Sequence, residues 1–204
     1  MRLTAPLFPA GQEWVLVDAD PELLASVEPV AGVVFKTRLA DLMLDLEDLL
    51  SPDLDLLTCS ALLDLCSAAW LERLADALVR HRLPFYAVLN YDGREVWEPR
   101  HPSDPAALAA FHADQRRDKG FGPALGPDAH REIVRMLRER GFEVIEGSSD
   151  WDLQQPGDGP LIEALAEGSA SVSNDRDWLS ARRGAERVMI GHQDLFARPQ
   201  SGTG

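Results

Sequence analysis

The alternation of strand-like and helix-like segments is the feature that most constrains how this chain can fold. The strand-like segments are short apolar runs rich in β-branched and aromatic residues, and the segments between them carry apolar residues at helical spacing. Strands are expected over residues 14–17, 32–36, 54–59, 84–91, 142–147 and 187–197. Because short links join the first four strands to their helices, the pattern predicts an α/β fold whose sheet is mostly parallel, with helices on both faces.

Local signals mark where helices begin and where strands end. Asp20 is a favourable N-cap for a helix that starts at Pro21, because aspartate accepts hydrogen bonds from free N–H groups and proline has no N–H to satisfy. Asp92-Gly93 is a typical turn pair and is expected to end the fourth strand. Further helices are expected over residues 39–50, 64–82, 103–115, 127–140, 160–167 and 174–185.

Length and composition fit one domain of ordinary size. The chain has 204 residues, of which 45% are hydrophobic, and this is enough to bury one core. We expect a single domain over residues 1–198 and a flexible tail over residues 199–204. The N-terminal residues lack the apolar stretch of a signal peptide and no segment approaches the ~20 apolar residues of a membrane span, so a cytoplasmic location is expected.

The charge balance narrows the expected partners. Lys and Arg together number 20 against 34 Asp and Glu, which gives a formal net charge of -14. Such a charge repels polyanions, so we expect a small-molecule partner and neither nucleic acid nor a membrane.

Cys59 and Cys66 form no Cys-x-x-Cys unit and are expected to be small buried side chains. The five histidines lack the spacing of a metal site, so no metal is expected.

Polar residues at the ends of expected strands are the candidate binding residues. Asp18 closes the first strand, where a carboxylate could accept hydrogen bonds from both hydroxyls of a ribose; the alternative is a plain polar strand end. Asp41 could face an adenine amino group from the next strand-to-helix turn, or it could be one more acid on a solvated helix face. Asn90 and Tyr91 end the fourth strand, where they could meet substrate groups or simply precede a turn.

The usual phosphate-binding and nucleophile motifs are absent from the sequence. There is no G-x-G-x-x-G, no lysine-bearing phosphate loop and no G-x-S-x-G. The segment "GFGPALG" follows a helix rather than a strand, and a rigid loop over a pocket explains it better than a phosphate cradle. Ser60 could pair with a distant histidine as a nucleophile, but any chain of this size offers such pairs by chance.

Six segments of the sequence are long enough to be specific and cover nearly the whole chain. They are "WVLVDADPELL", "ADLMLDLEDLL", "DLLTCSALLDLCSAAWLERL", "LPFYAVLNYDGR", "QRRDKGFGPALGPDA" and "VMIGHQDLFARP". Together they resemble one bacterial subfamily of class I S-adenosylmethionine-dependent methyltransferases. The resemblance implies a Rossmann-like methyltransferase sheet, S-adenosyl-L-methionine as the cofactor, and methyl transfer to a small-molecule acceptor.

The resemblance also implies roles for individual residues. Asp18 matches the acid that holds the ribose hydroxyls. Asp41 and Leu42 match the adenine-binding turn, and Ser60 matches the position beside the methionine part and the methyl donor. The expected substrate-binding residues are Asn90, Tyr91, Asp118, Lys119 and Phe121, the last three from a loop near the substrate mouth. The resemblance identifies no catalytic base.

The sequence departs from this family at its start. In the family, a first strand and a glycine-rich loop precede the ribose acid by about twenty residues or more, whereas seventeen residues precede Asp18. We therefore expect the central first strand and its loop to be missing, through a start recorded too late, a genuine fragment, or a rearranged sheet that does not bind the cofactor. The rival functions are a non-catalytic methyltransferase-like interaction protein and a nucleotide-dependent oxidoreductase, which also uses an acid after a strand.

Overall fold

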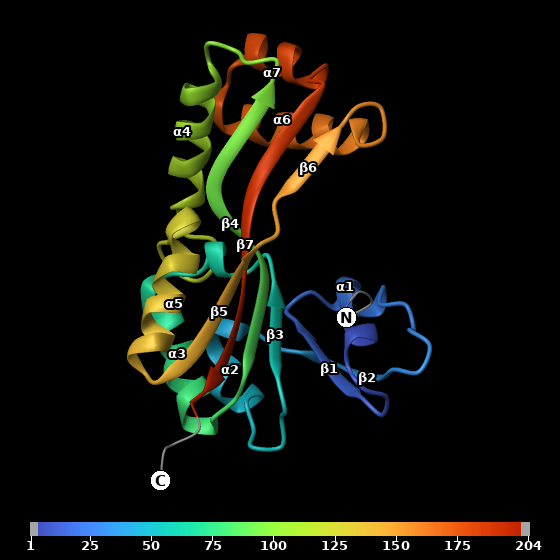
Figure 1. Cartoon of the computed structure of the whole chain (residues 1–204), viewed down its shortest axis with the longest axis vertical. Helices are drawn as coiled ribbons and strands as arrows, with labels where there is room; N and C mark the ends of the chain where they lie inside the picture. The colour runs from blue at the N-terminus through green and yellow to red at the C-terminus, as the bar shows by residue number, and fades with distance from the viewer. Residues whose placement is uncertain (1–3, 201–204) are drawn as a thin grey trace. The chain divides into compact units, whose positions relative to one another are not determined.

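The contacts within the chain form two compact units, one up to Leu50 and one from Ser51 onward. The computed structural model describes residues 4–200 (Figure 1). The sequence predicts one domain over residues 1–198, and the two units divide that range at Leu50. Each unit has its own strands and helices.

The first unit is built on two parallel strands. They are β1 (Glu13–Asp18) and β2 (Val34–Leu39), paired in register from one end to the other. The other elements are η1 (Ala5–Leu7), α1 (Pro21–Ala25) and α2 (Leu42–Leu49). The predicted start of α1 is confirmed, because the Asp20 side chain accepts hydrogen bonds from the N–H groups of Glu22 and Leu23.

The second unit contains a five-stranded sheet. Its strands are β3 (Leu57–Ser60), β4 (Phe85–Glu98), β5 (Phe142–Ser148), β6 (Trp151–Gln154) and β7 (Arg187–Pro199). The order is β3-β4-β7-β5, and β6 pairs with the beginning of β7. Strand β3 is parallel to β4, whereas β4, β5 and β6 are all antiparallel to β7. All strands of this sheet except β7 therefore run in the same direction, which confirms an α/β fold with a mostly parallel sheet.

The helices of the second unit gather in two groups along the long β4 and β7 strands (Figure 1). One group contains η2 (Leu63–Leu65), α3 (Ala68–His81), η3 (Gly126–Asp128) and α5 (Ala129–Glu139). The other group contains α4 (Asp104–Gln115), α6 (Gly159–Ser173) and α7 (Arg176–Arg183). The second group packs around the end of β4 and the beginning of β7.

Each helix group covers its own hydrophobic core. Leu71, Leu74 and Leu78 of α3 are almost fully buried, as are Ile133 and Leu137 of α5. A second cluster, which we call the distal core, lies at the far end of β4 and β7 and consists of Tyr91, Trp97, Ala107, Ile162, Ala166, Ala170, Trp178, Ala185, Val188 and Ile190. The two tryptophans of the distal core meet edge to face, with ring centroids 5.6 Å apart. Strands β4 and β7 are long because each supplies buried residues to both cores.

The predicted turn at Asp92-Gly93 is wrong, because β4 continues through it to Glu98. The pairing with β7 shifts between Tyr91 and Glu95, so the pair forms an irregularity within the strand. Gly93 has φ +90, a conformation that glycine adopts without strain. The strand resumes beyond it because Trp97 is buried in the distal core.

The C-terminal end of the chain also differs from the expectation. Strand β7 includes Pro199, which pairs with Phe142, and the Gln200 N–H donates to the Gly141 carbonyl at 3.1 Å. The ordered strand therefore enters the segment expected as a tail, and residues 201–204 of that segment lie outside the described residues.

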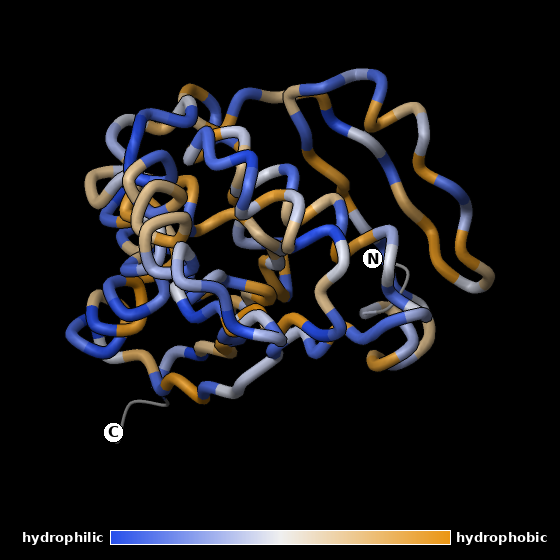
Figure 2. Tube along the Cα trace, turned by 90° about the horizontal axis from the view of Figure 1, so that it is seen from above, coloured by the Kyte–Doolittle hydropathy of each residue, from blue (hydrophilic) through white to orange (hydrophobic). Residues whose placement is uncertain are grey.

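Hydrophobic stretches are short everywhere along the described trace (Figure 2). They alternate with hydrophilic stretches, as strands and amphipathic helices do when each buries one side. In residues 4–200, no helix combines the length and the apolar character that crossing a membrane requires.

Candidate functional site

Asp18 and Asp41 lie at the same edge of the two-stranded sheet in the first unit. Asp18 is the last residue of β1 and pairs with Leu39, the last residue of β2. The backbone N–H of Ala40 donates to the Asp18 carbonyl at 3.0 Å, and Asp41 follows directly as the N-cap of α2. Ligands of parallel sheets collect outside the carboxyl ends of the strands, and both acids lie at such ends.

A hollow of about 420 Å³ opens beside Asp18 within the first unit. Its lining residues are Leu16, Val17, Asp18, Leu23, Leu24, Ser26, Val27 and Glu28. One carboxylate oxygen of Asp18 accepts a hydrogen bond from the Asp20 N–H at 2.9 Å, and no described residue bonds to the other oxygen. Five of these residues are apolar and three are polar, so the hollow combines apolar surface with a carboxylate oxygen of Asp18 that can accept a hydrogen bond.

Asp41 and Leu42 have structural tasks at the start of α2. The Asp41 carboxylate accepts a hydrogen bond from the Met43 N–H at 2.8 Å, so one of its oxygens is used as a helix cap. Leu42 is the first residue of the helix and is half-buried. The exposed position of Asp41 leaves its second carboxylate oxygen at the strand-to-helix turn.

The second unit has a corresponding edge where β3 and β4 end side by side. We call Ser60, Ala61, Asp64, Leu89, Asn90 and Tyr91 the β3–β4 edge. Ser60 pairs with Val88, and the Ala61 N–H donates to the Val88 carbonyl at 3.0 Å. Ser60 itself is exposed. Three of the predicted site residues, Ser60, Asn90 and Tyr91, are thus brought together at one edge.

Backbone strain is concentrated at this edge. Ala61 has φ +49 and Leu89 has φ +55, although neither is glycine. The strained backbone of Leu89 is held by its N–H, which donates to the Asp194 carboxylate at 2.8 Å. The Ser149 hydroxyl donates to the same carboxylate at 2.5 Å. Residues held in such conformations cluster at functional sites, where the surrounding structure keeps them in place.

Two buried acceptor atoms at the β3–β4 edge have no hydrogen-bond donor among the described residues. They are the side-chain oxygen of Asn90 and one carboxylate oxygen of Asp64. The Asn90 amide nitrogen is satisfied, because it donates to the carbonyls of Ala87 at 3.3 Å and Gln193 at 2.8 Å. Burial raises the pKa of Asp64, against smaller opposing effects of its own N–H and of His192. Buried oxygens without donors are rare in proteins and are places where water or a ligand binds.

Tyr91 is a junction of hydrogen bonds. Its hydroxyl lies 3.0 Å from a carboxylate oxygen of Glu95 and 3.0 Å from Nε2 of His112. Burial and the neighbouring Glu95 raise the pKa of Tyr91, and burial raises the pKa of Glu95. Burial, with the nearby Arg116 guanidinium, lowers the pKa of His112. The phenol therefore stays protonated and holds β4 against α4.

The loop with Asp118, Lys119 and Phe121 is fastened to the segment that follows β3. The Asp118 carboxylate accepts hydrogen bonds from the N–H groups of Gly120 at 2.8 Å and Gly122 at 3.1 Å. Lys119 forms an ion pair with Asp114 at 2.6 Å, so its charge is engaged within the loop region.

Phe121 anchors the same loop. Its ring packs on Trp70 with centroids 5.1 Å apart, and its backbone bridges to Cys66. Further along the loop, the Leu125 N–H donates to the Cys66 carbonyl at 2.9 Å. The loop thus lies against the segment between the β3–β4 edge and α3, and its hydrogen bonds and ring packing hold it there.

His192 was not singled out from the sequence, yet it faces the β3–β4 edge. It pairs with Tyr91 across β4 and β7, and the centroids of the two rings are 6.2 Å apart. Its ring also lies 5.0 Å from that of Trp151. In the sequence, no spacing relates His192 to another histidine. The one available signal is its position beside Gln193 and Asp194 in an expected strand.

Cysteine and metal chemistry find no support in the described part of the chain. Cys59 and Cys66 are free thiols, and burial raises the pKa of Cys59 to about 12 and that of Cys66 even further. Such thiols stay protonated. Cys66 is buried as expected, whereas Cys59 is half-buried. No described group of three or more His, Cys, Asp or Glu side chains could hold a metal ion.

The fold is similar to three solved bacterial structures. The YcgJ protein of Bacillus subtilis is 14% identical, with a TM-score of 0.48 over 94% of this chain and 84% of its own. A proposed methyltransferase of Bacillus halodurans is 12% identical, with a TM-score of 0.48 over 93% and 84%. A cyclopropane-fatty-acyl-phospholipid synthase-like protein of Lactobacillus casei is 10% identical, with a TM-score of 0.49 over 94% and 86%. No protein-family model matches the chain, and no curated protein matches it.

Proposed function

We propose that this protein is an S-adenosylmethionine-dependent methyltransferase that acts on a small-molecule acceptor. The observation that carries the proposal is the position of Asp18, at the carboxyl end of a parallel strand and at the border of an apolar hollow. The resemblance of six sequence segments to class I methyltransferases supports it. The net charge of -14 opposes a nucleic-acid substrate.

The residues of the first unit fit the adenosine part of the cofactor. The free carboxylate oxygen of Asp18 can accept a hydrogen bond from a ribose hydroxyl, and Leu16, Leu23 and Leu24 offer apolar contacts. Asp41 and Leu42 would bind the adenine from the following turn. The resemblance assigns Ser60, which belongs to the second unit, to the methionine part.

The remaining candidates would bind the acceptor. Asn90 and Tyr91 supply a free amide oxygen and a buried ring at the β3–β4 edge, and Asp118, Lys119 and Phe121 belong to the loop beside it. The bound cofactor supplies an electrophilic methyl group. Much of the rate of a displacement at such a methyl comes from holding nucleophile and methyl in line, which is a task of rigid, well-anchored residues.

Calorimetric titration with S-adenosylhomocysteine tests the proposal. We expect the wild-type protein to bind and Asp18→Ala to weaken binding by about tenfold or more, because a hydrogen bond to a charged group is worth about 1.5–3 kcal/mol. Asp48→Ala removes the same charge from an exposed position on α2 and serves as the control. Absence of binding to the wild-type protein would contradict the proposal, and binding of a nicotinamide dinucleotide instead would favour an oxidoreductase.

A further inference from the structure

The two ring nitrogens of His192 differ in their surroundings. Nδ1 lies 3.2 Å from the carbonyl oxygen of Ile190, which can only accept a hydrogen bond. In the neutral ring this contact keeps the proton on Nδ1 and leaves a lone pair on Nε2. No described residue bonds to Nε2, which is also not one of the fully buried unpartnered atoms. The ring therefore presents a free basic nitrogen.

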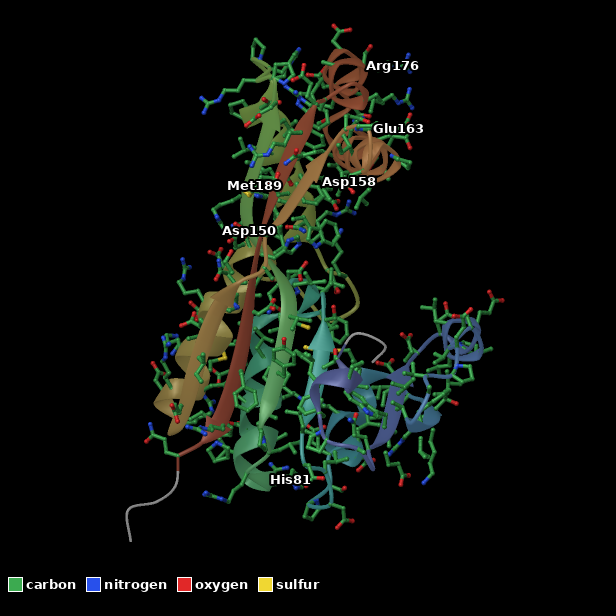
Figure 3. All side chains as sticks on the ribbon, turned by 45° about the vertical axis from the view of Figure 1, so that its right-hand side comes forward. His81, Asp150, Asp158, Glu163, Arg176 and Met189 are labelled. Atoms are coloured by element: carbon green, nitrogen blue, oxygen red, sulfur yellow. The ribbon has the colours of Figure 1, made fainter. Side chains whose placement is uncertain are left out.

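The groups around His192 hold the ring in place and face it with negative charge. The ring is packed between those of Tyr91 and Trp151, and its backbone N–H donates to the Asp150 carboxylate at 3.0 Å. Asp64, from η2, lies near enough for the charge of His192 to lower its pKa. Figure 3 shows Asp150 in the link between β5 and β6, beside β7. The Arg94 guanidinium pairs with Asp150 at 2.8 Å, so Asp64 is the carboxylate near His192 that has a free oxygen.

We propose that His192 is the general base of the methyl transfer and accepts a proton from the acceptor at Nε2. This inference rests on the proposed function. The acceptor's X–H bond gives its proton to Nε2 and its electron pair to X, and X forms the new bond to the methyl carbon. The electron pair of the broken carbon–sulfur bond stays on sulfur. The imidazolium that forms is stabilised by Asp64 and later releases its proton to water.

The other four histidines are less suited to this task. Nε2 of His112 is engaged with the Tyr91 hydroxyl. Nε2 of His130 bonds to Glu146, and Nδ1 of His101 accepts from the Ser103 N–H. His81 is the last residue of α3 and lies just before the beginning of β4, at the opposite end of the β3–β4 pairing from the β3–β4 edge (Figure 3).

Acylation with diethyl pyrocarbonate tests the reactivity of Nε2 without a known acceptor. The reagent attaches a carbethoxy group to a neutral imidazole nitrogen, and peptide mass spectrometry locates it. In the native wild-type protein we expect modification of His192 at least about fivefold faster than that of His112, whose Nε2 is engaged with the Tyr91 hydroxyl. His81→Gln is the control and should leave the rate at His192 unchanged. A native His192 that does not react would overturn the proposal.

The position of the ring proton gives a second, independent readout. A long-range proton–nitrogen NMR spectrum at alkaline pH should show the His192 proton on Nδ1, with His192→Gln used to assign the signals. A proton on Nε2 would overturn the proposal, because the nitrogen facing the edge would then be a donor. The acylation experiment measures His192 in the intact wild-type protein, so it does not depend on whether the variant folds.

Turnover separates the inference from the proposed function. With methyl-labelled S-adenosylmethionine and catechol, thiophenol or benzylamine as acceptors, His192→Gln should lose about 100-fold or more in rate while its affinity for S-adenosylhomocysteine stays within about twofold. Full turnover in the variant overturns the role of His192 alone. Failure of the wild-type protein to bind S-adenosylhomocysteine overturns the proposed function, and the inference falls with it.

Discussion

The hydroxyl oxygen of Tyr91 lies 3.0 Å from Nε2 of His112, and this contact joins β4 to α4. Tyr91 also bonds to Glu95, four residues further along its own strand, across the irregularity at Asp92-Gly93. The hydroxyl donates its one proton to the Glu95 carboxylate, so its oxygen accepts from Nε2 of His112. The continuation of β4 into the distal core thus depends on a polar junction that is largely buried.

Tyr91→Phe should destabilise the protein by about 1–3 kcal/mol, because Glu95 and His112 both lose a partner in a buried place while the ring contacts with Phe111 remain. Urea unfolding followed by tryptophan fluorescence measures the change. Tyr86→Phe is the matched control in the same strand, and we expect it to stay within about 0.5 kcal/mol of wild type. If Tyr91→Phe and Tyr86→Phe lowered the free energy of unfolding equally, the hydrogen bonds of Tyr91 would not explain the loss.

Arg182→Met should cost about 3–5 kcal/mol. The Arg182 side chain is 1% exposed and bonds to both carboxylate oxygens of Asp104, at 3.0 and 3.1 Å, and to the Pro99 carbonyl. Methionine preserves much of the volume but leaves the Asp104 carboxylate without its countercharge. The neighbouring substitution Arg183→Met breaks only exposed pairs with Glu163 and Glu167 and should cost less than about 1 kcal/mol. Similar urea midpoints for the two variants would contradict the expectation that the buried Arg182–Asp104 pair contributes more stability than the exposed pairs of Arg183.

The strand and helix pattern could be predicted from the sequence because burial imposes it directly. β-Branched runs and leucine spacing follow from which side of an element faces a core, and the helix start at Pro21 follows from local hydrogen bonding by Asp20. The long reach of β4 could not be predicted in this way. Asp92-Gly93 has the local preferences of a turn, and only the burial of Trp97 in the distal core, a tertiary effect, keeps the strand going. Strand β6 was missed for a similar reason, since its four residues are too few to show a period.

The candidate site could be predicted only in part. Asp18, Ser60 and Asn90 follow from the rule that ligands meet the carboxyl ends of parallel strands. Asp64 and His192 gave no such signal, because one lies in a short helical turn and the other in an antiparallel strand. Their proximity arises from the pairing of distant segments, which no local pattern records.

Asp64→Asn should stabilise the protein increasingly as the pH rises. Burial raises the pKa of Asp64 in the folded state, so the folded protein holds this proton more firmly than the unfolded chain does. The stability that the protonated form contributes is complete below about pH 4, the ordinary aspartate range, and is lost as the pH climbs through the raised value. Asparagine does not titrate and avoids that loss.

Urea unfolding at several pH values between about 4 and 8 checks this expectation. The raised pKa of Glu95 affects both proteins equally and cancels in the difference. Asp53→Asn, at an exposed position, is the control. If the difference in free energy of unfolding between Asp64→Asn and wild type stays constant, folding does not shift the pKa of Asp64; if it shrinks toward neutral pH, Asp64 is stabilised as a carboxylate. Either result would contradict the expectation.

Two glycine-to-alanine substitutions should have opposite effects on stability. Gly191, in β7, is buried, and a Cβ there would collide with the Asp92 carboxylate and lie 2.8 Å from Cβ of Arg94. Gly191→Ala should therefore disturb the Arg94–Asp92 ion pair and destabilise the protein by about 1–3 kcal/mol. Gly168, inside α6, has no atom within 4 Å of the added carbon. Gly168→Ala should stabilise the protein by about 0.5–1 kcal/mol, because alanine loses less freedom on entering a helix. Thermal unfolding of the two variants decides, and a Gly191→Ala protein as stable as wild type would mean that β7 can move away from Asp92 at no cost.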